Sequence, residues 1–280
     1  MNLSFICHWN NKELLEECLL SSKFTSNGDE LILLDGCPSQ SSAYIEGERL
    51  AKNNTLVFVH QDLVLSKKWR LDLAKRIDEV NKKDPKWGVI GTVGFYIDKD
   101  GNFNITGHGE SRYWKYSTEV DTLPLKVHWL DNQAFVKRKG ILVFDSKIPK
   151  FHGTVEDLCE SARSKGRGVW AVNLYTKHHS LETNRLANDA WECAHYLVKK
   201  WDRLVIVGST FFWPTHKTYH INNISKLMRR DDGTKILPKE VTKYNLPDGV
   251  SCFTINKNSP SGVVRQMVGI QVIDEYRKEF

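Results

Sequence analysis

Three strand-like apolar runs lie within the first 65 residues, and segments long enough to form helices separate them. The runs are Leu3–Cys7, Glu30–Leu34 and Leu56–Val59. Neighbouring parallel strands need a crossover of about a dozen residues or more, usually a helix, and both intervening segments have that length. The order strand, helix, strand, helix, strand therefore predicts one half of a Rossmann-like, doubly wound α/β sheet flanked by helices.

The third run ends in two polar side chains that indicate a ligand site. Leu56–Val59 is continuously apolar, which is typical of a strand buried on both faces of a parallel sheet, and such strands end at the crevice where ligands bind. His60 and Asp62 follow it two residues apart, so in extended backbone they share one side and Gln61 points away. One imidazole and one carboxylate on a common side can hold a divalent cation, which can in turn hold a diphosphate. Alternatively, both residues only end the strand and cap the next segment.

The rest of the chain continues the α/β pattern and then changes. Trp87–Tyr96 and Gly168–Leu174 are predicted as further core strands, Lys126–Val136 as strand-like, and the spacing of apolar residues predicts a helix over Arg185–Trp201. We expect Asn10 or Asn11 to cap the first helix and Ser66 to cap the helix after the third strand. The turn residues Asp98–Asn102 predict a hairpin or a mobile loop that extends to about Val120. Beyond a short strand at Leu204–Gly208 we expect irregular structure, because prolines interrupt the sequence. We therefore expect one domain at residues 1–182, with a nucleotide-binding half at about 1–100 and an acceptor half at about 101–182, and a helical or irregular extension at 183–280 packed on it.

Composition narrows the class of partner and the compartment. The 280 residues carry 40 Lys and Arg against 34 Asp and Glu, a net charge of +6. That mild excess suits anionic ligands such as sugar nucleotides, and without a basic aromatic patch we expect no nucleic acid partner. No apolar run reaches the roughly 18 residues of a membrane span, and no signal-peptide pattern precedes the first strand. Six cysteines without a C-x-x-C pair favour free thiols in a reducing, cytoplasmic setting.

Further polar residues stand where predicted strands end or where a loop leads into a helix. They are Asp35 after the second strand, Glu156 and Asp157 at the start of a helix, and His178 and His179 after the last core strand. Together with the H-Q-D at 60–62 they resemble the GT-A glycosyltransferases, and most closely family 2-like members in which H-Q-D replaces the usual D-x-D motif. The resemblance covers roughly residues 1–182 and rests on short motifs in the family's order: Val57–Asp62 with Trp69, Trp87–Gly91, Leu130–Asp131, Phe151–Leu158 and His178–Ser180.

The resemblance implies a metal-assisted enzyme that uses Mn²⁺ or Mg²⁺. Sugar transfer from a nucleotide diphosphate builds negative charge on the leaving group, and a bound ion neutralises that charge as a Lewis acid. By resemblance, Asp62 is the principal metal ligand, His60 lies beside it, and His178 or His179 is the third ligand. A neutral imidazole here replaces the first carboxylate, which lowers the negative charge of the site and its expected affinity for metal. The alternative for the paired histidines is a surface position at the end of a strand.

An acceptor hydroxyl is a poor nucleophile at neutral pH, so the transfer also needs a base. The resemblance gives this role to Asp157, with Glu156 as the neighbouring alternate. Adjacent carboxylates raise each other's pKa, which suits a group that must accept a proton near pH 7. Residues 154–157 also fit a capping box, in which Asp157 would only stabilise the start of the helix.

The same resemblance places the nucleotide donor at the ends of the first strands. His8 and Asp35 would contact the nucleotide, His60 and Asp62 its diphosphate, and Asp131 the donor sugar and the acceptor. A carboxylate can accept the imide N–H of uracil, which favours a UDP-sugar as donor. A turn-forming aspartate is the alternative for Asp35.

We therefore expect a glycosyltransferase of glycan biosynthesis that moves a hexosyl or pentosyl group from a nucleotide-diphosphate sugar to a glycan hydroxyl, by an inverting single displacement. A sugar nucleotidyltransferase is one alternative, but it would carry a glycine-rich phosphate loop after the first strand, and His8–Asn11 contains no glycine. A non-catalytic homologue that binds sugar nucleotide or glycan is the other, and the missing first carboxylate supports it. The C-terminal extension is a candidate contact for a homo-oligomer.

Overall fold

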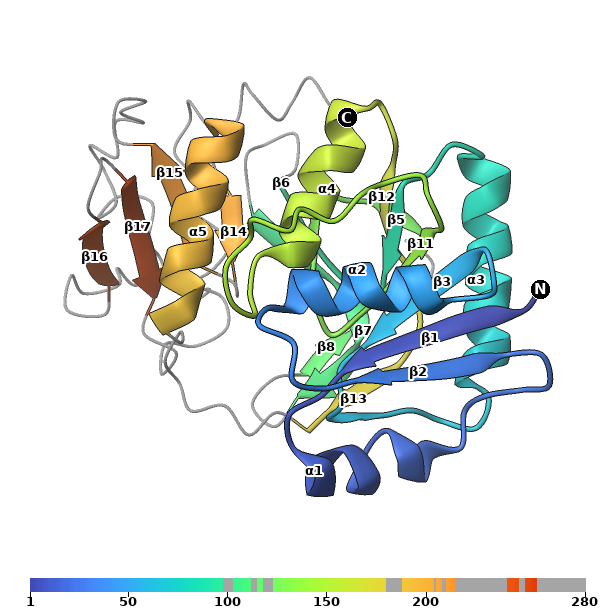
Figure 1. The fold of residues 1–280 in the computed structure, drawn as a ribbon. Helices are drawn as coiled ribbons and strands as arrows, with labels where there is room; N and C mark the ends of the chain where they lie inside the picture. Colours follow the sequence, from blue (N-terminus) through green and yellow to red (C-terminus); the bar gives the residue numbers. More distant parts are fainter. Residues whose placement is uncertain are drawn as a thin grey trace.

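The computed structural model describes most of the first 203 residues and parts of the remainder. The described ranges are 1–97, 103–111, 115–117, 123–179, 188–203, 205–207, 210–214, 241–246 and 250–255. They form three β-sheets with helices packed against them (Figure 1). The mixed α/β architecture predicted from the sequence is confirmed.

A seven-stranded mixed sheet forms the centre of the fold. In spatial order its strands are β2 (Glu30–Leu34), β1 (Leu3–His8), β3 (Thr55–Val59), β11 (Ala134–Arg138), β5 (Val89–Gly91), β12 (Val169–Ala171) and β9 (Leu125–Lys126). β1 pairs in parallel with β2 and β3, and β11 lies antiparallel between β3 and β5. Because β12 runs parallel to β5, the carboxyl ends of β1, β2, β3, β5 and β12 all lie at one edge of the sheet. Ligands of doubly wound sheets bind at that edge.

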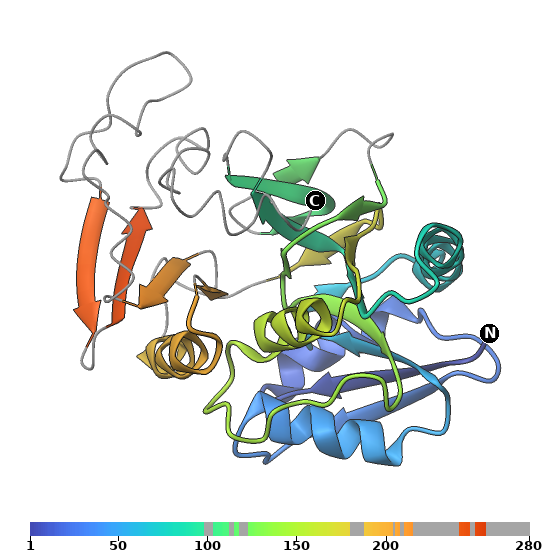
Figure 2. The same ribbon diagram turned by 90° about the horizontal axis from the view of Figure 1, so that it is seen from above.

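Helices cover both faces of the central sheet, which makes it doubly wound (Figures 1 and 2). α2 and α4 cover the face to which Phe58 points, and α1 and α3 cover the face to which Val57 points. Both side chains are fully buried, as a continuous apolar run predicts for a strand covered on both sides. The helices are α1 (Lys12–Glu17), which Asn11 caps as expected, α2 (Gln40–Leu50), α3 (Trp69–Lys83), α4 (Thr154–Ser164) and α5 (Asn188–Trp201), with a 3-10 turn at Leu20–Ser22.

A second, smaller sheet stands at the carboxyl edge of the first. Its order is β10 (Trp129–Leu130), β6 (Val93–Ile97), β7 (Phe103–Ser111), β13 (Thr176–His178) and β4 (Leu63–Val64), and β8 (Lys115–Ser117) pairs with β7. The hairpin predicted around residue 100 is confirmed by the antiparallel pairing of β6 and β7, and its turn at 98–102 lies outside the described residues. β4 directly follows the H-Q-D, and β13 ends in His178.

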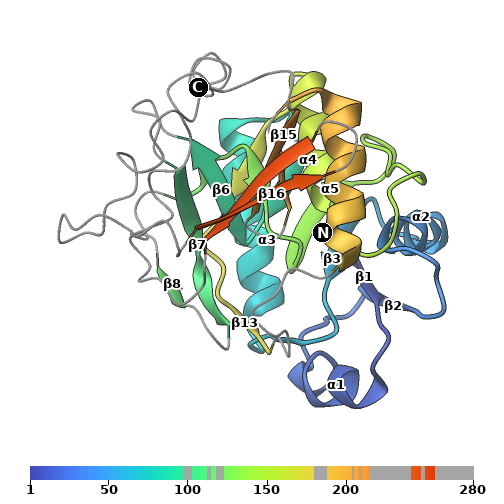
Figure 3. The same cartoon turned by 90° about the vertical axis from the view of Figure 1, so that its left-hand side faces the viewer.

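The C-terminal part contains more regular structure than its sequence predicts. The short strand predicted at Leu204–Gly208 is confirmed as β14 (Val205–Val207). Irregular structure was expected after residue 208, and this is wrong for the described residues, because β15 (Thr210–Pro214), β17 (Val250–Ile255) and β16 (Val241–Leu246) continue an antiparallel sheet from β14 in that order. Pro214 stands at the last position of its strand, where the missing N–H is tolerated. α5 lies beside α4 (Figures 2 and 3), and residues 185–187 of the predicted helix fall outside the described residues.

Two local predictions are wrong. Ser66 does not cap α3: Lys68 precedes the helix without a side-chain cap, and Ser66 contributes only its carbonyl, which accepts the N–H of Trp69. The strand predicted over 126–136 is divided among β9, β10 and β11 and so contributes to two sheets.

No helix among the described residues combines the length and apolar character that crossing a membrane requires.

A buried ion pair ties α2 to the central sheet. Lys137 on β11 is fully buried, and its Nζ lies 2.6 Å from a carboxylate oxygen of Glu48 on α2. The Lys137 ammonium also lies 5.0 Å from the centre of the Phe144 ring. Burial lowers the pKa of Lys137, and Glu48 raises it in opposition. The pair therefore compensates a charge that could not otherwise be buried.

We predict that Glu48→Ala lowers the free energy of unfolding by about 3 kcal/mol, because it leaves the Lys137 ammonium buried without its partner. The double variant Glu48→Ala, Lys137→Met should recover most of that loss, since no charge remains to be buried. Urea denaturation measures both values. Equal losses in the single and the double variant would contradict this account of the pair.

Candidate active site

The H-Q-D forms a turn at the carboxyl edge of the central sheet, directly after β3. The Gln61 amide points back to the start of α1. Its oxygen accepts the N–H groups of Asn10 and Asn11, both at 3.0 Å, and its nitrogen donates to Asn10 Oδ1 at 2.7 Å. Gln61 thereby fixes the turn and leaves His60 and Asp62 on a common side, with His60 Nδ1 3.9 Å from Asp62 Oδ1.

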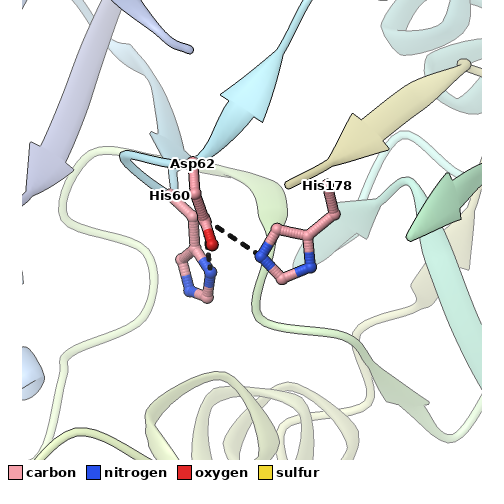
Figure 4. Close-up of side chains that lie close together, drawn as sticks. All are labelled: His60, Asp62 and His178. Atoms are coloured by element: carbon pink, nitrogen blue, oxygen red, sulfur yellow. Dashed lines mark hydrogen bonds and ion pairs between the residues drawn. The ribbon is translucent and has the colours of Figure 1, made fainter. Parts of the chain in front are cut away.

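His178 reaches the same place from 116 residues further along the chain. β13 pairs antiparallel with β4, which sets His178 opposite Leu63, and the His179 N–H donates to the Asp62 carbonyl at 2.7 Å. This pairing places His178 Nε2 3.0 Å from Asp62 Oδ1 (Figure 4). The ring centres of His60 and His178 are 5.5 Å apart. Two segments distant in the sequence therefore converge on one carboxylate.

The three side chains offer donor atoms that fit a divalent metal ion. One nitrogen from each of His60 and His178 and one oxygen of Asp62 all lie within 4.8 Å of one another. The carboxylate suits Mg²⁺ and Mn²⁺, whereas the imidazoles move the preference toward later first-row ions. His179 is exposed and lies outside this cluster, so the two neighbouring histidines have different surroundings.

The charges in the cluster favour the metal-binding forms of these side chains. Burial lowers the pKa of His60 to about 4, against the opposing effect of Asp62, so the ring is neutral at pH 7 and keeps a free lone pair. Burial alone would raise the pKa of Asp62, but the hydrogen bond from His178 and the charges of both histidines bring it below its ordinary value. Asp62 is therefore an anion at neutral pH.

Two further side chains lie close to the cluster. Asp131 raises and His152 lowers the pKa of His60 through their charges, although burial has the largest effect. Asp131 is held in place because its Oδ1 accepts the Gln133 N–H at 2.9 Å. His152 belongs to the Phe151–Leu158 motif, but the sequence did not indicate a role for it. Its position just before the start of α4, a helix whose first turn carries two acids, is the signal that could have found it.

The ends of β1 and β2 bring His8 and Asp35 to the same edge of the sheet. The Trp9 N–H donates to the Leu34 carbonyl at 2.9 Å, which keeps the two strand ends together. Burial lowers the pKa of His8, and the charge of nearby Asp35 opposes that shift. The Phe151 ring stacks on His8 with centres 5.2 Å apart and planes 8° from parallel. The sequence did not indicate this aromatic neighbour.

The two carboxylates in the first turn of α4 have different surroundings. Asp157 is 2% exposed, and both its oxygens bind α5: Lys200 Nζ lies 2.7 Å from Oδ1 and 2.9 Å from Oδ2, and Trp201 Nε1 donates to Oδ1 at 2.7 Å. Burial raises the pKa of Asp157, while Lys200 and Trp201 lower it. Glu156 is also buried, and its charge adds to the effect of burial in raising the pKa of Tyr44 on α2.

The capping role considered for Asp157 is wrong. The residue before α4 is Gly153, with φ of 77°, and no side chain caps the helix there. Thr154 is already the first helical residue, so it cannot act as the cap that a capping box requires. The role of Asp157 as a base stays a prediction.

Comparison with known proteins gives distant matches. No protein family model matches the sequence. A curated protein of Fuscovulum blasticum, "ATP synthase subunits region ORF 6", is 26% identical over 131 residues, which are 46% of this chain and 52% of that protein. The chain thus spans about half the length of the curated relative that it matches.

Solved structures similar to this one include the following three proteins. S. aureus TarS 1-349 in complex with UDP-GlcNAc is 13% identical with a TM-score of 0.48, over 71% of this chain and 66% of that one. GalNAc-T7 with UDP, GalNAc and Mn²⁺ is 10% identical with a TM-score of 0.45, over 64% of this chain and 44% of that one. Glucosyl-3-phosphoglycerate synthase from Mycobacterium tuberculosis, with Mg²⁺ and UDP, is 12% identical with a TM-score of 0.41, over 65% and 72%. At TM-scores below 0.5 these likenesses assign no reaction to this chain.

We predict that Mn²⁺ binds to His60, Asp62 and His178, and that His178→Ala or Asp62→Asn weakens binding by at least about tenfold. Loss of a residue that only orients a ligand already costs 10- to 100-fold, so loss of a ligand costs no less. Isothermal titration with Mn²⁺ in the presence of UDP measures the affinity. His179→Ala is the matched control and should bind as the unmodified protein does. Equal losses in the two histidine variants would contradict the assignment.

Proposed function

We propose that this chain is a glycosyltransferase that moves a sugar from a UDP-sugar to a hydroxyl of a glycan acceptor. The convergence of His60, Asp62 and His178 at the carboxyl edge of a doubly wound sheet carries the proposal. Sheets of this kind bind nucleotides at that edge. The resemblance of the H-Q-D and its neighbouring motifs to family 2-like GT-A members supports the same function.

In this proposal, the two ends of the donor bind to successive strand ends. A uracil ring can stack against the aromatic pair of His8 and Phe151, and Asp35 can accept its imide N–H. His60 and Asp62 follow β3, the strand next to β1, so the diphosphate would extend from one strand end to the next. The donor sugar would then lie toward Asp131, whose charge acts on His60.

His60, Asp62 and His178 would hold Mn²⁺ or Mg²⁺ beside the diphosphate. When bound, the ion neutralises the charge that develops on the leaving group. The protein contributes one negative charge to this site, from Asp62, because both other ligands are imidazoles. The neutral form of His60 at pH 7 leaves its lone pair available for the ion.

The acceptor hydroxyl must lose its proton as it attacks the sugar, and we assign that proton to the first turn of α4. Asp157 is the base in this proposal, and Glu156 is the alternate. Burial raises the pKa of Asp157, which favours proton acceptance near neutral pH. The Lys200 ammonium binds both oxygens of Asp157, so it must release one oxygen before that oxygen can accept the proton. One base and one ion suit a single displacement with inversion.

Two alternatives make different demands on the site. A sugar nucleotidyltransferase needs a phosphate-binding turn and helix after the first strand, whereas here that turn lacks glycine and α1 is only six residues long. A non-catalytic homologue would keep the nucleotide contacts and bind the donor without turnover. The cytoplasmic location and the homo-oligomer remain predictions from the sequence.

We predict metal-dependent release of UDP from a UDP-sugar, and a loss of turnover of about 100-fold in Asp157→Asn that exceeds any loss of donor affinity, because an amide cannot accept the proton of the acceptor hydroxyl. A coupled assay for UDP, run with a panel of UDP-sugars and glycan acceptors, measures turnover, and calorimetry measures donor binding. Glu156→Gln is the matched variant, and if it alone loses activity the base is Glu156. Donor binding without UDP release would identify the non-catalytic homologue, and a requirement for a nucleoside triphosphate would identify the nucleotidyltransferase.

A further inference from the structure

Side chains in the last two turns of α5 bind acidic residues of α4 and of the loop that precedes it. Besides Asp157, Lys200 binds Asp145, with Nζ 2.6 Å from Oδ2, and the Tyr196 hydroxyl donates to the same oxygen at 2.7 Å. Just beyond α5, Arg203 lies 3.3 Å from a carboxylate oxygen of Glu160, which is 1% exposed. We call Tyr196, Lys200, Trp201 and Arg203 the α5 clamp.

Apolar packing brings the same two segments into close contact. Gly153, with φ of 77°, precedes α4, and a Cβ built on it would lie 3.0 Å from Leu197 Cδ1 and 3.3 Å from Cys193 Cβ. The Cys193 thiol donates to the Pro149 carbonyl at 2.6 Å. Leu197 and Cys193 are fully buried. α5 therefore holds the segment 145–153 by ion pairs at one end and by packing at the other.

The segment held in this way reaches the candidate active site. The Lys150 carbonyl accepts the N–H of Gln40 at the start of α2, at 2.8 Å. Phe151 stacks on His8, and His152 acts on His60 through its charge. The first turn of α4 then follows. The position of these groups thus depends on α5.

The charges explain why the clamp is needed. Asp157 and Glu160 are buried on α4, and burial of an unpaired carboxylate is strongly unfavourable. Burial alone would raise the pKa of Asp145, but Lys200 and Tyr196 bring it down to about 2. A single ammonium, Lys200, therefore joins a carboxylate of the loop to a carboxylate of α4.

We propose that Lys200 and Trp201 are positioning residues that act through Asp157 to hold the segment 145–157 in the active site. The role in catalysis rests on the function proposed above, and the mechanical role does not. Residues 188–203 then help to form the active site. The domain boundary expected at residue 182 would therefore separate residues that act together. The sequence places the clamp in the extension, where no catalytic contribution was expected.

Hydrogen–deuterium exchange tests the mechanical role without any assay of activity. Lys200→Met and Asp157→Asn should each speed amide exchange across residues 145–157 while leaving β1–β3 unchanged. The increase in the double variant should be smaller than the sum of the two single increases, because both substitutions remove the contact between Lys200 and Asp157. Lys200→Arg should retain protection, since a guanidinium can bind both carboxylates. Lys82→Met, at an exposed lysine of α3, is the control. Unchanged exchange in 145–157, or effects that add in the double variant, would overturn the proposal.

Turnover tests the catalytic role. In Lys200→Met and in Trp201→Phe, kcat for UDP release should fall about tenfold, and Lys200→Arg should restore most of the rate. UDP affinity should weaken by a smaller factor, because Phe151 lies in the loosened segment, and Mn²⁺ affinity should stay within about twofold, because His60, Asp62 and His178 lie outside it. A wild-type rate in Lys200→Met would overturn the catalytic role. A loss of Mn²⁺ affinity as large as the loss of kcat would do so as well, because it would show a general loss of structure. If the unmodified protein releases no UDP at all, the proposed function fails, and the exchange experiment still decides the mechanical role.

Discussion

The pairing of β13 with β4 is the contact on which the candidate metal site depends. It sets His178 3.0 Å from Asp62, whereas the H-Q-D alone offers only two ligands. Side chains alternate between the two faces of a strand, so a slip of one residue in this register would present His179 and turn His178 away. The His179 N–H, which donates to the Asp62 carbonyl at 2.7 Å, helps to prevent that slip. The register of this backbone pairing therefore determines which histidine faces Asp62.

Local sequence pattern was sufficient for the sheet and for half of the site. The parallel order of β1, β2 and β3 follows from apolar runs separated by helix-length segments. His60 and Asp62 lie on a common side as predicted, but in a turn that Gln61 holds and not in the extended backbone that the prediction assumed. The choice between His178 and His179 needed the strand register, which spacing within one segment does not contain. The same holds for residues 126–136, where three short strands belong to two sheets although a strand-like pattern suggested a single strand.

The surroundings of Asp157 show a different limit of sequence reasoning. Its acidic neighbour and its place at the start of a helix suggested either a base or a cap, and both ideas used only residues nearby in the chain. Its actual partners, Lys200 and Trp201, lie 43 and 44 residues later. Helical periodicity predicted that α5 would exist and which stripe would be apolar, but the polar residues of its last turn carried no sign of their targets. Long-range ion pairs are set by tertiary packing alone.

The Gln61 side chain connects the expected nucleotide region near His8 to the turn that carries His60 and Asp62. A single amide joins Asn10 and Asn11, which follow His8, to the turn that carries His60 and Asp62. If a ligand shifts either end, the strain passes through this amide to the other. Thermodynamic linkage makes such an effect reciprocal, so each occupant would change the other's affinity by the same factor. The affinity for the nucleobase would then depend on whether the cation is bound, and the affinity for the cation on whether the nucleobase is bound.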